Sequence, residues 1–163
     1  MDEAWSENAL SAFLVEAKRG TYAAGGDAGR VSSPLAGAHQ LEYRSGSWLY
    51  RDLYYGSARF AGQETVSVGD VPIWSMVYAG GVPTGAGVSP GEVYAFLRLA
   101  LQRVGAERPY RGPEGWEVGA WRYACAVSGD LMAFEGCERI TRDGREVYAL
   151  VFAGGAILST GEA

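Results

Sequence analysis

Residues 60–81 read FAGQETVSVGDVPIWSMVYAGG, and residues 134–155 read FEGCERITRDGREVYALVFAGG. Seven of the 22 positions are identical at this offset of 74 residues, and seven more are conservative. Gly69-Asp70 and Asp143-Gly144 interrupt the two stretches at turn positions, as in strands joined by hairpins. Self-similarity at a fixed spacing indicates an internal repeat, so we predict a fold of two related halves.

A predicted helix precedes each of these stretches. Apolar residues recur at helical spacing from Glu7 to Lys18. The second helix begins with Ser89, Pro90 and Glu92, which is the pattern of a capping box. Ala12-Phe13-Leu14 matches Ala95-Phe96-Leu97 at an offset of 83 residues. Repeat one is therefore expected over about 6–81 and repeat two over about 89–157.

The remaining segments alternate in the manner of antiparallel strands. We expect strands at 40–44, 48–55, 60–68, 71–79, 116–127, 131–142 and 145–153, and a long Gly-rich loop at 23–38. The fold class is α+β: one domain, 1–163, in which two pseudo-symmetric repeats form one curved antiparallel sheet or half-barrel with two main helices. A concave sheet face between related halves is a common place for a small-molecule pocket.

Composition excludes several function classes. A net charge of -5 and a pI near 4.9 exclude nucleic acid as a direct partner. No apolar run approaches the roughly 20 residues of a membrane span, and the acidic start is unlike a signal peptide, so we expect a cytoplasmic protein without membrane contact.

The two cysteines, Cys125 and Cys137, are not spaced as a metal or redox pair, and His39 is the single histidine. We expect no metal site and no cofactor, and a turn at 128–130 that leaves the cysteines out of register.

A series of short motifs extends over nearly the whole chain. It comprises Phe13-Leu14-x-x-Ala17-Lys18-x-x-Thr21-Tyr22-Ala23, Leu41-Glu42-Tyr43, Tyr50-x-Asp52-x-Tyr54-x-Gly56, Phe60-x-Gly62-x-Glu64-x-Val66, Pro72-x-Trp74-x-Met76-x-Tyr78-x-Gly80, Tyr110-Arg111-Gly112 and Phe134-x-Gly136-x-Glu138. This series resembles a bacterial family of unknown function whose members occur alone or behind a helix-turn-helix domain of the xenobiotic-response-element type. The resemblance implies an effector-sensing role for some members. The chain departs from the family pattern at Val77 and Ala79, where a more polar residue is usual.

Glu64 and Glu138 occupy equivalent positions in the two repeats. Each shares a strand face with an aromatic residue, Phe60 or Phe134, so each carboxyl is expected on the apolar side of the sheet. Such a group has a raised pKa and can act as an acid, a base or a ligand anchor. The alternative is structural, with each glutamate accepting hydrogen bonds from backbone, Tyr or Trp groups. Duplication favours the structural role.

Residues that only one half contains are better candidates for function. Asp52 has Ala126 at the 74-residue offset, and no acidic counterpart. The candidate ligand-binding set is Lys18, Tyr22, Glu42, Asp52, Tyr54, Glu64, Trp74, Tyr78 and Glu138. Its aromatic members would suit an aromatic or cationic ligand. Cross-strand aromatic packing, or for Lys18 a favourable position at a helix C-terminus, is the structural alternative.

The leading hypothesis is a small-molecule-binding or sensor-like domain with an aromatic, partly acidic pocket between the repeats. The alternatives are a small cofactor-independent acid–base enzyme using Asp52 or Glu64, and a protein-interaction or homodimerisation module. A pocket with Asp52 or Glu64 at its floor and a shifted pKa favours the enzyme. An apolar pocket without shifted groups favours the binder, and a flat apolar patch without a cavity favours the module. A concave face filled by side chains would exclude the shared pocket.

Overall fold

The computed structural model describes residues 5–25 and 27–159. These residues form an α+β fold with two helices, α1 (Glu7–Gly20) and α2 (Pro90–Leu101), a short 3-10 turn η1 (Tyr22–Ala24), and one open antiparallel sheet. The sheet has the order β1-β2-β3-β4-β5-β9-β8-β7-β6. Its strands are β1 (Arg30–Val31), β2 (His39–Ser45), β3 (Trp48–Gly56), β4 (Arg59–Val68), β5 (Val71–Gly81), β6 (Gly115–Val118), β7 (Trp121–Asp130), β8 (Ala133–Arg142) and β9 (Arg145–Ala156).

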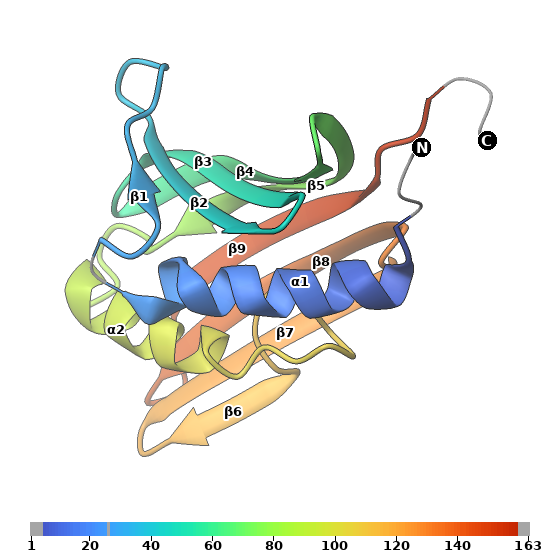
Figure 1. Ribbon diagram of the computed structural model, residues 1–163. Coiled ribbons are helices and arrows are strands. Elements are labelled where there is room, and N and C mark those ends of the chain that lie inside the picture. Colours follow the sequence, from blue (N-terminus) through green and yellow to red (C-terminus); the bar gives the residue numbers. More distant parts are fainter. Residues whose placement is uncertain (1–4, 26, 160–163) are drawn as a thin grey trace.

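The sheet curves around the helices, so that its concave face holds the core (Figure 1). β5 and β9 join the two strand sets at its centre, where Tyr78 pairs with Phe152. The 74-residue offset relates these same two positions, and it also relates the bounds of β4 to those of β8. The α+β class with a curved antiparallel sheet is as expected. The internal duplication itself stays a prediction.

Both helices begin where the sequence provides a cap. Ser6 Oγ accepts a hydrogen bond from the amide of Ala9 at 3.2 Å, and Ser89 with Glu92 forms the expected capping box at the start of α2. The face of α1 that meets the sheet carries Leu10, Phe13, Leu14 and Ala17, all of which are buried.

Aromatic side chains fill the core between the helices and the sheet. Trp74 stacks on Phe134 at 5.7 Å between ring centroids, and its indole Nε1 donates a hydrogen bond to the carbonyl of Leu131 at 3.1 Å. On α2, the ring of Phe96 stacks on those of Trp116 and Trp121, with centroid distances of 5.0 and 5.2 Å. These contacts join α2 and β5 to the far strands of the sheet.

Two hairpins differ from the sequence-based prediction. Segment 116–127 is two strands, because Gly119 adopts a φ of 58° in a turn between β6 and β7. The predicted turn at 128–130 lies inside β7, and the chain instead turns at 131–132, where the Asp130 carboxylate accepts hydrogen bonds from two backbone amides. Cys125 consequently faces Glu138, and Cys137 faces Ala126, so the cysteines are out of register as expected.

The predicted loop at 23–38 contains part of η1 and the short strand β1, while Gly26 lies outside the described residues. Among the helices described, none is long and apolar enough to cross a membrane.

Replacing Trp74 by Ala tests the core. Trp74 is fully buried and also holds the β7–β8 turn through its indole, so Trp74→Ala is expected to lower the free energy of unfolding by about 3–5 kcal/mol in urea denaturation. Val71→Ala is the control on the same strand, because Val71 is exposed, and it is expected to stay within about 0.5 kcal/mol of wild type. Equal losses for both variants would contradict this packing.

Candidate functional site

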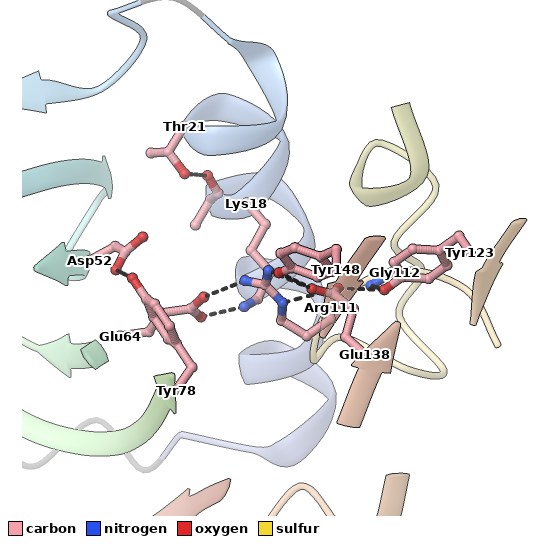
Figure 2. Close-up of polar contacts among 11 residues, drawn as sticks. Lys18, Thr21, Asp52, Glu64, Tyr78, Arg111, Gly112, Tyr123, Glu138 and Tyr148 are labelled. Carbon is pink, nitrogen blue, oxygen red and sulfur yellow. Dashed lines mark hydrogen bonds and ion pairs between the residues drawn. The ribbon is translucent and has the colours of Figure 1, made fainter. Parts of the chain in front are cut away.

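Arg111 lies at the centre of a buried set of charges on the concave side of the sheet (Figure 2). Its guanidinium donates to both carboxylate oxygens of Glu138, at 3.2 Å from Nε and 3.0 Å from Nη2. Its Nη1 lies 3.9 Å from Oε1 of Glu64, and the ammonium of Lys18 pairs with the other oxygen of Glu64. One arginine therefore connects β4 and β8, and Lys18 adds α1 to the same cluster.

Glu138 is fully occupied by donors from the protein. Besides Arg111, the hydroxyls of Tyr123 and Tyr148 donate to it at 2.6 and 2.7 Å, and the Tyr123 hydroxyl in turn accepts from the amide of Gly112 at 2.9 Å. Within residues 5–25 and 27–159, every fully buried side-chain nitrogen and oxygen has a partner. Glu138 thus has the contacts of a structural carboxylate.

The charges of this cluster balance, with Lys18 and Arg111 facing Glu64 and Glu138. Burial opposes the charged form of Arg111, but Glu138 and Glu64 oppose that effect and the pKa of Arg111 is raised well above its usual value. Burial lowers the pKa of Lys18, although Glu64 acts in the other direction. The ion pairs among these four residues offset the cost of removing their charges from water.

Asp52 is a third buried carboxyl next to this balanced set. Asp52 on β3 is opposite Glu64 on β4 in the strand register. Its Oδ1 accepts a hydrogen bond from the hydroxyl of Tyr78 at 2.5 Å. Burial, followed by the charge of Glu64, raises the pKa of Asp52 to about 7 against the opposing effects of Tyr78, Arg111 and Lys18. Asp52 can therefore gain or lose a proton near neutral pH.

A pocket of about 290 Å³ opens above Asp52, where the first strands of the sheet face α2 and the loop carrying Arg111. Aromatic rings and basic side chains line it together. The lining residues are Tyr22, Arg30, His39, Asp52, Tyr54, Gly56, Ser57, Phe60, Tyr78, Tyr94, Arg98 and Arg111. A ligand in this pocket would meet a carboxyl and a phenol at its floor and guanidinium groups around it.

The structure brings most of the predicted site residues together. Tyr22, Asp52, Tyr54 and Tyr78 line the pocket. Lys18 and Glu64 lie behind it, around a small cavity of about 20 Å³ that they share with Asp52 and Arg111.

Three predicted residues lie away from the pocket. The carboxylate of Glu42 pairs with Arg51 at 2.9 Å and does not line the pocket, Trp74 is in the core, and Glu138 is held within the charge cluster.

Sequence reasoning did not select the basic residues Arg30, Arg98 and Arg111, or the rings of Phe60 and Tyr94. The sequence does contain one indication of Arg111. Two glutamates on an apolar strand face require a cation, and Arg111 stands in the apolar segment Pro109-Tyr110-Arg111-Gly112-Pro113. The helical spacing of Tyr94 and Arg98 shows that they share a side of α2, but gives no sign of a pocket there.

Side chains fill much of the concave face, where α1 and α2 pack, yet a pocket remains at one end. The predicted first half contributes its strands, and α2 and Arg111 come from the predicted second half.

The outer face also has a shallow apolar hollow, lined by residues that include Val77, Ala79, Ala126, Val151 and Ala153. In the described part of the chain, no group of three or more His, Cys, Asp or Glu residues could hold a metal ion.

Comparison with known proteins gives a family but no activity. The model of a family described as a domain of unknown function, DUF5680, matches residues 52–157, which is more than half of the chain. No curated protein and no solved structure matches the chain. The matched region contains Asp52, Arg98 and Arg111 but begins after Lys18 and Tyr22.

Removing Arg111 tests whether the charge cluster holds the fold. Arg111→Met leaves Glu138 and Glu64 buried without their shared cation, so we expect a loss of about 3–5 kcal/mol in the free energy of unfolding. Arg122→Met is the matched control, because the pair between Arg122 and Glu117 is exposed, and its loss is expected to be at most about 1 kcal/mol. Similar losses for both variants in urea denaturation would refute the structural role.

The pH dependence of stability tests the state of Asp52. The folded protein binds the Asp52 proton more tightly than the unfolded chain, whose carboxyl has the ordinary pKa of 3.8. Stability is therefore lost as pH rises from about 4 to about 7. Relative to Asp52→Asn, which cannot titrate, wild type is expected to lose about 1.4 kcal/mol per pH unit in that window.

Denaturation curves collected at pH 4, 5, 6 and 7 measure this difference. Asp70→Asn, in the exposed turn between β4 and β5, is the control for the removal of one carboxyl from the chain. If the free energies of unfolding of wild type and Asp52→Asn differ by the same amount at every pH in the window, the pKa of Asp52 is not raised.

Proposed function

The chain belongs to the DUF5680 family of domains of unknown function, and we propose that it is a small-molecule-binding domain whose ligand occupies the pocket above Asp52. The observation that carries this proposal is the combination of Asp52 and Tyr78 at the floor of a cavity with aromatic walls. A few polar groups converging in a mainly aromatic cavity are typical of ligand sites. The volume, about 290 Å³, suits a small metabolite.

Hydrogen bonds and ion pairs hold the residues behind the pocket in place. Asp52 and Arg111 both reach the pocket, and both also contact or border the buried charge cluster. Arg111 is fixed by two hydrogen bonds to Glu138, so its guanidinium does not have to be ordered when a ligand binds. Preorganised polar groups lower the entropic cost of binding.

A second candidate function is acid–base catalysis by Asp52. The raised pKa of about 7, at the floor of a ligand-sized pocket, is the condition set out above for the enzyme alternative. Asp52 would transfer a proton to or from the bound molecule, and Tyr78 would position the carboxyl through its hydrogen bond. The two candidates share one site and differ in whether the bound molecule is converted.

A thermal-shift screen against a metabolite library tests ligand binding, because a compound that binds only the folded state raises the melting temperature. Tyr54 and Tyr55 are adjacent on β3, with Tyr54 lining the pocket and Tyr55 exposed and outside its lining. For a compound that stabilises wild type, Tyr54→Ala is expected to weaken binding by roughly 3- to 10-fold in calorimetric titration. Tyr55→Ala is expected to leave the affinity unchanged.

Two outcomes contradict the proposal: no compound in the library stabilises the protein, or the stabilising compounds bind Tyr54→Ala and Tyr55→Ala equally. Incubating each ligand with wild type and with Asp52→Asn, followed by NMR of the ligand, decides between the two functions. Conversion by wild type alone, with binding retained in Asp52→Asn, supports the enzyme.

A further inference from the structure

We infer that the ligand is a small planar organic anion, one aromatic ring bearing a carboxylate or a phosphate, whose charged group is bound by Arg98. This inference rests on the proposed function and adds the chemical class of the ligand. It comes from three features of the pocket: the sign of its charges, the arginine among its described lining residues that forms no ion pair, and the shape of its walls.

The pocket is locally basic although the whole chain is acidic. Arg30, Arg98 and Arg111 line it, and Asp52 is the one carboxyl among the described lining residues. The oxygen Oδ1 of Asp52 is already hydrogen-bonded to Tyr78. The net charge of the chain is -5, so these cations are a local feature of the pocket. A cationic ligand, which the sequence alone allowed, would meet the uncompensated guanidinium of Arg98, since the other two lining arginines are paired with carboxylates.

Arg98 differs from the other two arginines of the pocket because it has no acidic partner in the part of the chain that the structure describes. Arg111 is paired with Glu138, and Arg30 lies 2.9 Å from the carboxylate of Asp27. Among residues 5–25 and 27–159, no carboxylate forms an ion pair with the half-buried side chain of Arg98. A guanidinium beside a cavity without a counter-charge is a site for an anion, because its fork of donors matches carboxylate and phosphate oxygens.

The walls next to Arg98 are suited to a flat ring. Tyr94 precedes Arg98 by one helical turn, and its ring lies 5.9 Å from that of Phe60, which in turn lies 5.8 Å from that of Tyr78. These rings surround the cavity on the side of α2 and the central strands. Aromatic walls favour stacked or edge-on contacts with another ring. A volume of about 290 Å³ is at the lower limit for ligand pockets and leaves no room for a dinucleotide.

Four probes of nearly the same shape separate charge from fit: benzoate, phenyl phosphate, neutral benzamide and cationic benzamidine. Binding to the ¹⁵N-labelled full chain is followed by NMR titration up to millimolar concentrations. We expect benzoate or phenyl phosphate to shift the signals of Tyr22, Tyr54 and Arg98, with benzamide and benzamidine at least about tenfold weaker. The better of the two anions identifies the charged group.

Charge reversal provides the matched variants. Arg98→Glu is expected to weaken the binding of the preferred anion by about tenfold or more. Benzamidine is expected to become the tightest-binding of the four probes. Arg145→Glu changes the net charge equally in the exposed hairpin between β8 and β9, and it is expected to keep the wild-type order. The signals of the free variants, recorded first, show that each is folded.

The outcomes separate this inference from the proposed function. If benzamide or benzamidine binds wild type as well as the anions do, and Tyr54→Ala weakens that binding, the anion class is wrong and the pocket is still a ligand site. If Arg98→Glu and Arg145→Glu change anion binding equally, Arg98 is not the anchor. If none of the four probes shifts any pocket signal, the ligand class inferred here is wrong, and the library screen alone then decides the proposed function.

Discussion

The burial of two carboxylates on the apolar side of the sheet is the constraint on which the rest of the structure depends. Neither Glu64 nor Glu138 could remain charged there without a cation, since an unpaired charge in an apolar interior costs several kcal/mol. Arg111 meets this need for both, and Lys18 completes the pairing of Glu64. The loop after α2 must therefore pass across the concave face, and α1 must present its C-terminal end to β4. These contacts thus constrain α1 and the loop after α2, in addition to the apolar packing of both helices on the sheet.

The same arrangement creates the site, because it leaves Asp52 without a cation of its own. The two cations are already matched by two carboxylates, so a third buried carboxyl is held by the phenol of Tyr78 and lies beside the charge of Glu64. Its proton is consequently retained to about neutral pH. The opposite half has Cys125 at the register position facing Glu138, and Phe152 where Tyr78 stands, so it has no equivalent carboxyl–phenol pair. The site therefore lies on one side of the central strand pair β5–β9, in which Tyr78 is opposite Phe152.

The sequence predicted strands and faces well because alternation and turn residues are local properties. The inward position of Glu64 follows from the two-residue period of a strand, and the start of α2 follows from its capping box. Gly129 predicts a turn at 128–130, whereas in the structure it is a strand residue with a φ of 93° and the chain turns at 131–132, directly after β7. The convergence of Arg98 on the pocket could not be predicted, because it depends on how α2 lies against the earlier strands β1 to β5 in the folded chain. Local patterns carry no information on such contacts.

The balanced charge cluster also constrains how this protein can change over generations. Loss of Arg111 alone leaves two buried acids, and loss of Glu138 alone leaves a buried guanidinium with two tyrosine hydroxyls that have lost their acceptor. Single substitutions at these positions are therefore expected to destabilise the fold more than compensated pairs of substitutions do. Lys18 with Glu64, and Arg111 with Glu138, are accordingly expected to vary together among relatives or not to vary at all. This covariation would identify distant members of the family even where the rest of the chain has diverged.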